Sequence, residues 1–118
     1  MRVALLAALF AVAAAGPVAA DPGADAFNDK CADCHALQPM AGQTAPPLAG
    51  VVGRKIASVG GFDYSKALKA KADGVWTEAA LDAFLTDPNA YAPGVQMFAS
   101  VPDGAQRKLI IDYLKTQK

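Results

Sequence analysis

The 118-residue sequence predicts an all-α domain with four to five short helices and long loops. Three observations lead to this fold class. Apolar residues recur three and four positions apart in segments 81–85 and 109–114, as on the buried face of a helix. No segment shows the alternation of apolar and polar residues that a half-buried strand requires. Most of the 8 prolines and 10 glycines fall outside the periodic segments, where they indicate turns and loops.

The first helix of the domain is expected to begin at Asp21 and to run to about Cys34. Asp21 is a suitable N-cap because its carboxylate can accept hydrogen bonds from the free N–H groups of the first turn. Pro22 then suits the first helical position. Phe27 is expected on the buried face of this helix.

A long loop is expected from Ala36 to about Asp63. This stretch lacks helical periodicity and is interrupted by turn-forming residues, namely Pro39, Gly42, Pro46, Pro47, Gly50, Gly53 and the pair Gly60-Gly61. A loop of this length needs a surface to pack against. A short helix is expected after it, over Ser65 to Lys71.

Two further helices are expected in the second half of the chain. The first is capped by Thr77 and ended by Asp87-Pro88, and its apolar stripe consists of Leu81, Phe84 and Leu85. A second loop is expected from Asn89 to Pro102. Asp103 then caps the last helix, whose buried face is expected to hold Leu109, Ile110, Tyr113 and Leu114.

Residues 1–20 have the pattern of a secretory signal peptide, which leaves residues 21–118 as the mature domain. Arg2 gives a positive start, Val3 to Ala15 is apolar, and Val18-Ala19-Ala20 places small residues at the expected cleavage site. An uncleaved membrane anchor is the alternative, but the apolar run is shorter than the roughly 20 residues that a spanning helix needs. We therefore expect export, and no stable membrane insertion after cleavage.

The charge of the chain is balanced, with 11 basic and 11 acidic residues. Removal of Arg2 with the signal peptide leaves 10 basic residues against 11 acidic ones, which is a formal charge of −1. A nucleic-acid-binding protein would show a basic excess, and so would a protein held on an anionic membrane surface. Neither class of partner is expected.

Both cysteines and the only histidine lie within five residues, Cys31-Ala32-Asp33-Cys34-His35. C-x-x-C-H is typical of the attachment of a c-type haem, in which the thiols add to the two vinyl groups and the histidine binds the iron. A thioredoxin-like dithiol would need a strand-to-helix context. Zinc would need four ligands, and a disulfide across two residues of a helix has awkward geometry. The sequence therefore predicts one haem c, bound through Cys31 and Cys34, with His35 as an iron ligand.

The second axial ligand must come from another residue type, because His35 is the only histidine. Met1 would leave with the signal peptide, and Met40 follows His35 too closely to reach the opposite face of the haem. Met97, which follows Pro93-Gly94, is the better candidate, and a thioether suits haem iron. The alternatives are an open or lysine-bound sixth position, with Met97 only filling space in the core.

Residues 21–118 resemble the class I c-type cytochromes of the mitochondrial and alpha-proteobacterial kind. The resemblance is carried by several separate blocks: the haem motif at residues 31–35, a Gly-Arg-Lys block at residues 46–55, a Gly-Phe-x-Tyr segment at residues 61–64, Trp76, the methionine run at residues 87–98, and the last helix around residues 109–115. It implies the cytochrome c fold, wrapped around one covalently bound haem.

The resemblance also implies roles for residues outside the haem motif. The carbonyl of Pro46 would accept a hydrogen bond from the His35 ring. Three residues would bring N–H or O–H donors to the haem propionates: Arg54, Tyr64 and Trp76.

Packing between the first and last helices is implied as well, with Gly23 and Phe27 lying against Tyr113. One position departs from the family pattern, since Phe84 stands where an inward tyrosine is usual. A hydroxyl near the Met97 sulfur would therefore be missing.

The function implied is that of a soluble, monomeric, periplasmic electron carrier and not an enzyme. His35 and Met97 would stay bound while the iron changes oxidation state, and the thioether would favour the ferrous state and a high potential. Redox proteins would bind transiently as electron donor and acceptor. The alternatives are a haem subunit of a larger dehydrogenase or oxidase complex, and a gas-binding haem protein with an open sixth site.

Overall fold

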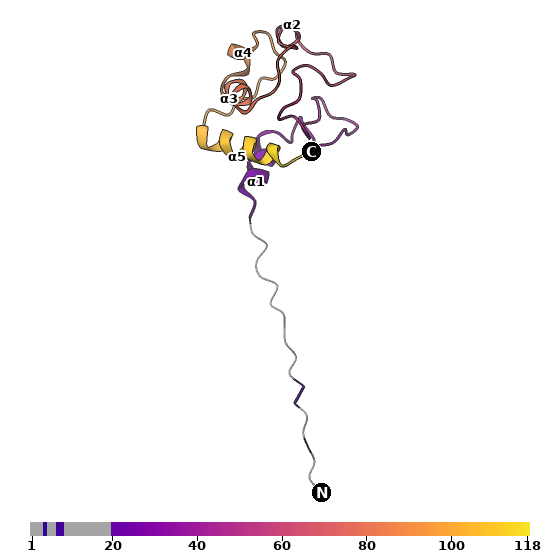
Figure 1. Cartoon of the computed structure of the whole chain (residues 1–118), viewed down its shortest axis with the longest axis vertical. Helices are drawn as coiled ribbons and strands as arrows, with labels where there is room; N and C mark the ends of the chain where they lie inside the picture. The colour runs from indigo at the N-terminus through magenta and orange to yellow at the C-terminus, as the bar shows by residue number, and fades with distance from the viewer. Residues whose placement is uncertain (1–3, 5–6, 9–19) are drawn as a thin grey trace.

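The computed structural model describes residues 4, 7, 8 and 20–118, so nearly all of the expected signal peptide lies outside the described residues (Figure 1). The described part folds into five helices: α1 (Pro22–Lys30), α2 (Lys66–Lys69), α3 (Glu78–Thr86), α4 (Pro88–Tyr91) and α5 (Gly104–Lys115). Within these residues, the only β pairing is an isolated antiparallel bridge between Lys55 and Val75. The predicted all-α fold class is confirmed.

Helix α1 begins as expected but ends earlier. The Asp21 carboxylate accepts hydrogen bonds from the N–H groups of Gly23 and Ala24, both at 3.1 Å. The helix ends at Lys30, and the predicted end at Cys34 was wrong. The N–H groups of Cys31 and Ala32 both bond to the carbonyl of Phe27, at 2.8 and 3.2 Å, and the chain continues as a series of turns.

Helices α1 and α5 lie side by side (Figure 1) and pack closely at Gly23. A Cβ atom at Gly23 would lie 2.8 Å from Cβ of Tyr113 and 3.0 Å from the carbonyl oxygen of Leu109. One turn further along α1, the Phe27 ring lies 5.6 Å from the Tyr113 ring between centroids. Glycine is therefore needed where the two backbones approach, as the resemblance implies.

Gly23→Ala is expected to destabilise the protein by about 1–3 kcal/mol, because the added methyl group must push α1 and α5 apart. Denaturant unfolding followed by helical circular dichroism would measure this. Gly60→Ala is the matched control, since a Cβ there would meet nothing within 4 Å. Equal stability of the two variants would contradict the close approach at Gly23.

The other predicted N-caps are confirmed. Ser65 Oγ accepts from Leu68 N–H at 3.3 Å, Thr77 Oγ1 from Ala80 N–H at 3.1 Å, and Asp103 Oδ1 from Ala105 N–H at 2.9 Å. The short helix predicted over Ser65 to Lys71 is only the single turn of α2, Lys66–Lys69.

Helix α4 corrects the prediction that residues 89–102 form a continuous loop. Asp87 and Pro88 do end α3, but they also begin a new helical turn. The Asp87 carboxylate accepts a hydrogen bond from Ala90 N–H at 3.1 Å, and Pro88 occupies the first helical position. One aspartate therefore ends one helix and caps the next.

The apolar core lies between α1, α3, α5 and the loop segments that cross them. The predicted stripe of α3 is buried, and α5 buries Ile110, Ile111 and Leu114. Leu109 was wrongly predicted to be buried, since it is 40% exposed. The buried arc of α5 is centred on residues 110, 111 and 114, which leaves Leu109 at its edge.

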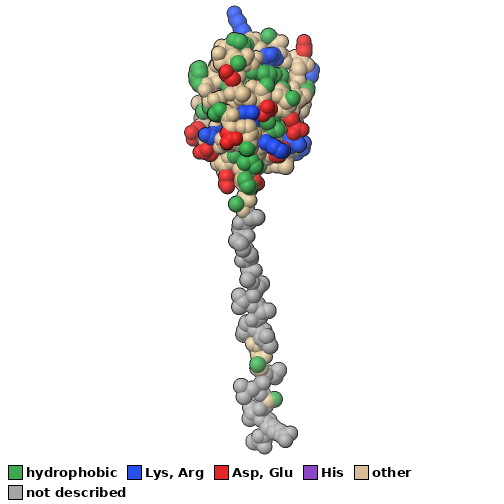
Figure 2. Space-filling model, turned by 90° about the vertical axis from the view of Figure 1, so that its left-hand side faces the viewer, with side chains coloured by type: hydrophobic (Ala, Val, Ile, Leu, Met, Phe, Trp, Pro, Cys, Tyr) green, Lys and Arg blue, Asp and Glu red, His purple; other side chains and the backbone are tan. Residues whose placement is uncertain are grey.

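Lysine, arginine and acidic side chains are interspersed on the face shown in Figure 2, with no large area of one sign. This agrees with the balanced charge of the sequence. None of the helices in the described part of the chain is long and apolar enough to cross a membrane.

Candidate functional site

The C-x-x-C-H motif forms a tight turn directly after α1. The N–H groups of Cys34 and His35 both donate to the carbonyl oxygen of Cys31, at 3.3 and 2.9 Å. This turn brings two thiols and one imidazole close together in the chain. Because α1 is packed against α5 through Gly23, the turn is attached to a rigid pair of helices.

The two thiols are free, and they differ in environment, since Cys31 is buried and Cys34 is exposed. Burial raises the pKa of Cys31 to about 11, so this thiol stays protonated at neutral pH. A reactive dithiol needs a lowered pKa instead. Across the described residues, no group of three or more His, Cys, Asp and Glu side chains could hold a metal ion. Covalent addition to a haem remains the chemistry that fits.

The His35 ring is held by one hydrogen bond, which leaves its other ring nitrogen free. Its Nδ1 lies 2.7 Å from the carbonyl oxygen of Pro46, which can only accept, so Nδ1 carries the proton and Nε2 keeps its lone pair. Burial lowers the pKa of His35, the bond to Pro46 partly opposes this, and the Arg54 charge lowers it further. A neutral ring with a free Nε2 is the form that ligates a metal.

The segment that fixes His35 is the proline strap, defined here as Pro46-Pro47. The next residue, Leu48, donates its N–H to the carbonyl of Ala36 at 2.9 Å, which ties the strap to the segment just after His35. Arg54 Nη1 donates to the carbonyl of Pro47, also at 2.9 Å. Neighbouring carbonyls of the strap therefore hold His35 and Arg54.

Arg54 and Trp76 meet across the isolated bridge, since Trp76 N–H donates to the Arg54 carbonyl at 2.8 Å. Burial lowers the pKa of Arg54, and Tyr64 is near enough to oppose this in part. The Tyr64 hydroxyl oxygen accepts from Val59 N–H at 3.1 Å. The structure thus brings Arg54 near Trp76 and Tyr64, the two other residues that were expected to contact the haem propionates.

Trp76 is also the centre of an aromatic cluster, defined as Trp76, Phe84 and Tyr91. The Trp76 ring is tilted against Phe84 at 5.1 Å and stacked on Tyr91 at 5.8 Å between centroids. Lys71 Nζ lies 4.5 Å from the centre of the Tyr91 ring. This packing fixes the indole on the α3–α4 side of the domain.

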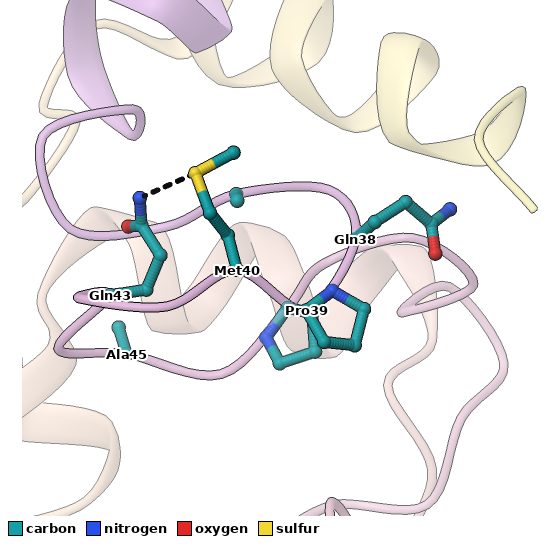
Figure 3. Close-up of a pocket in the computed structure, with 7 residues that line it drawn as sticks. Gln38, Pro39, Met40, Gln43 and Ala45 are labelled. Carbon is teal, nitrogen blue, oxygen red and sulfur yellow. Dashed lines mark hydrogen bonds between the residues drawn. The ribbon is translucent and has the colours of Figure 1, made fainter.

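Met40 and Met97 differ in environment. Met97 is half-buried and packs against the core. Met40 is 63% exposed and lines a small surface cavity of ≈ 140 Å³ with Gln38, Pro39, Gln43 and Ala45 (Figure 3). Its sulfur accepts a hydrogen bond from Gln43 Nε2 at 3.6 Å. Of the two, Met97 has the burial that a haem ligand needs.

The residues before Met97 form a fixed turn. Val95 N–H donates to the Ala92 carbonyl at 3.0 Å, and Gly94 between them has a φ of 86°, which favours glycine. Gln96 Nε2 then donates to the carbonyl of Asp63 at 3.1 Å. The residues just before Met97 are therefore held by the turn at Gly94 and by a hydrogen bond to the loop before α2.

Arg107 is a site-related residue that sequence reasoning missed. Its guanidinium bonds to the side chain of Asp82 and to the carbonyls of Val101 and Pro102, in the segment that follows Met97. Asp82 lies 25 residues away along the chain. No local pattern distinguishes this arginine from an ordinary exposed one in the first turn of a helix.

The chain is similar in sequence and fold to known proteins. The profile of the family Cytochrome c matches residues 20–118. Cytochrome c-550 from Ancylobacter novellus is 43% identical over 99 residues, covering 80% of this chain and 91% of that protein. Cytochrome c type-1 from Ascaris suum is 38% identical over 98 residues, covering 82% and 87%. The solved structure of cytochrome cH from Methylobacterium extorquens, 36% identical, matches with a TM-score of 0.71 and covers 81% of this chain and 96% of that one.

Proposed function

The chain belongs to the cytochrome c family and binds one haem c covalently, and on this basis we propose that it is a periplasmic one-electron carrier. The observation that carries the proposal is the geometry of the haem motif. Two thiols lie in the same turn as a neutral imidazole, and the 2.7 Å bond from Nδ1 to Pro46 leaves Nε2 free for iron.

In this proposal, Cys31 and Cys34 would hold the haem through two thioether links, and His35 and Met97 would be the iron ligands. When bound, the haem supplies the one-electron chemistry. The protein keeps both ligands in place in both oxidation states, through the proline strap on one side and the anchored Met97 segment on the other. The thioether favours the ferrous state and so a relatively high potential.

The haem propionates need donors if they are to be buried. Arg54 is suited to this, since a guanidinium has five N–H donors and can hold Pro47 and a carboxylate at the same time. Tyr64 and Trp76 supply an O–H and an N–H from neighbouring segments. The proximity of Arg54 to both residues supports this assignment.

We also propose that residues 1–20 direct export and are then removed. The mature protein, residues 21–118, would be a monomer that binds its redox partners transiently. Phe98, which follows Met97 directly and is 94% exposed, offers apolar surface for such encounters.

The proposed function predicts that the reduced protein, purified from the periplasmic fraction, does not bind carbon monoxide at neutral pH. The reason is that His35 and Met97 occupy both axial positions. The absorption spectrum of the reduced protein before and after addition of carbon monoxide measures this. Native mass spectrometry of the same sample should give a monomer of residues 21–118 with one haem.

Two outcomes would contradict the proposal in different ways. Rapid formation of a carbon monoxide complex would show an open sixth position and favour a gas-binding protein. Purification as a stable assembly with other subunits would favour a haem subunit of a larger enzyme.

A further inference from the structure

We propose that Arg107 is a positioning residue, which holds the segment between Met97 and α5 and so keeps the Met97 sulfur at the iron. The inference rests on the proposed ligation by Met97. A residue of α5 would then help to determine the position of the second iron ligand.

The contacts of Arg107 join three parts of the fold. Nε donates to the Asp82 carboxylate of α3 at 2.8 Å, and Nη1 donates to the carbonyls of Val101 and Pro102 at 3.0 and 2.9 Å. The Arg107 side chain is only 15% exposed, although that of Asp82 is 52% exposed. Hydrogen bonds from a charged donor are stronger than neutral ones, most of all away from solvent.

These contacts matter because the Met97 segment, defined here as residues 96–102, makes few other hydrogen bonds. Residues 98–100 are exposed and make no hydrogen bond to the described part of the chain. Before them, Gln96 is tied to the Asp63 carbonyl. After them, Val101 is buried, and its N–H donates to the Leu85 carbonyl at 2.7 Å. The segment is therefore held at its two ends.

Arg107 supplies most of the downstream attachment. Val101 has one further bond, to Leu85, whereas Pro102 has no N–H group and no other hydrogen bond to the described residues. Without the guanidinium, residues 98–102 would be held by one backbone bond and by the buried Val101 side chain. Met97 could then leave the iron through a smaller local opening.

Displacement of Met97 by an added ligand measures this opening directly. Imidazole is the probe, titrated into the ferric holoprotein and followed by the absorption spectrum. Arg107→Leu is expected to bind imidazole about ten-fold more tightly than the wild type, because two charge-assisted hydrogen bonds no longer oppose opening. Its weak near-infrared methionine–iron band should disappear at correspondingly lower imidazole concentrations.

Asp82→Asn is the matched variant on the other side of the ion pair. It removes the carboxylate charge and leaves both carbonyl bonds to Arg107 available, so the imidazole affinity should change less than about three-fold. If Arg107→Leu fails to fold, Arg107→Lys serves instead. A lysine keeps the charge but not the planar fork, and its imidazole affinity should rise in the same direction.

A purely structural role for Arg107 is tested with Phe27→Leu. This substitution weakens the α1–α5 packing and lowers the unfolding midpoint without touching the Met97 segment. If Phe27→Leu raises the imidazole affinity as much as Arg107→Leu does, the inference is overturned. Failure of Met97 ligation itself is seen separately, as a wild-type near-infrared band that is absent or that survives in Met97→Ala.

Discussion

The Cys31→Ala/Cys34→Ala double variant is expected to carry no covalently bound haem. Each thioether needs its own thiol, and these are the only two cysteines in the chain. Each single variant should keep at most one thioether link. Extraction with acidified acetone measures the result, since a covalent haem stays with the protein and a free one enters the solvent.

Asp33→Ala is the matched control, because it changes a residue of the same turn and keeps both thiols and His35. It should retain its haem through the extraction, as the wild type does. A wild-type protein that loses its haem to the solvent would show that the assignment of the C-x-x-C-H motif is wrong. So would a double variant that keeps it.

The local features of the fold could be predicted from the sequence. The caps at Asp21, Ser65, Thr77 and Asp103 depend on a side chain and an N–H group two or three residues away. The stripe of α3 depends on helical spacing over one short segment. Such features are determined by neighbouring residues, and neighbouring residues are what a single sequence displays.

Besides the helix ends of α1 and α2, the features that were missed depend on contacts across the chain or on one residue with two roles. Asp87 was predicted only to end a helix, although it also caps α4. Leu109 has the spacing of a buried residue, but the position of α1 and α3 determines which arc of α5 is covered. The bond from Arg107 to Asp82 joins two helices, and no local pattern predicts it.

In the candidate site, too, local features were predictable and long-range contacts were not. The haem motif indicates its own chemistry, because its five residues are consecutive. The bond between His35 and Pro46 was expected only through the resemblance to known cytochromes, since it closes a loop of 11 residues. The structure now supplies its length and the pKa effect of burial on the ring.

Met97→Ala is expected to change the iron site more than any other substitution outside the haem motif. Loss of the thioether leaves the sixth position to water or another ligand, and removes the sulfur that favours the ferrous state. Axial ligands shift haem potentials over a range of about 0.8 V, so a fall on the order of 0.1 V or more is expected. Potentiometric titration measures it, and the weak near-infrared band of the ferric protein should vanish.

Met40→Leu is the control that makes this result specific, because it also removes one methionine sulfur from the domain. Met40 is 63% exposed and hydrogen-bonded to Gln43, whereas Met97 is half-buried against the core. Met40→Leu should therefore keep both the near-infrared band and the potential of the wild type. The opposite result, in which the band disappears in Met40→Leu and persists in Met97→Ala, would contradict the assignment. Met40 would then be the iron ligand, and Met97 would not.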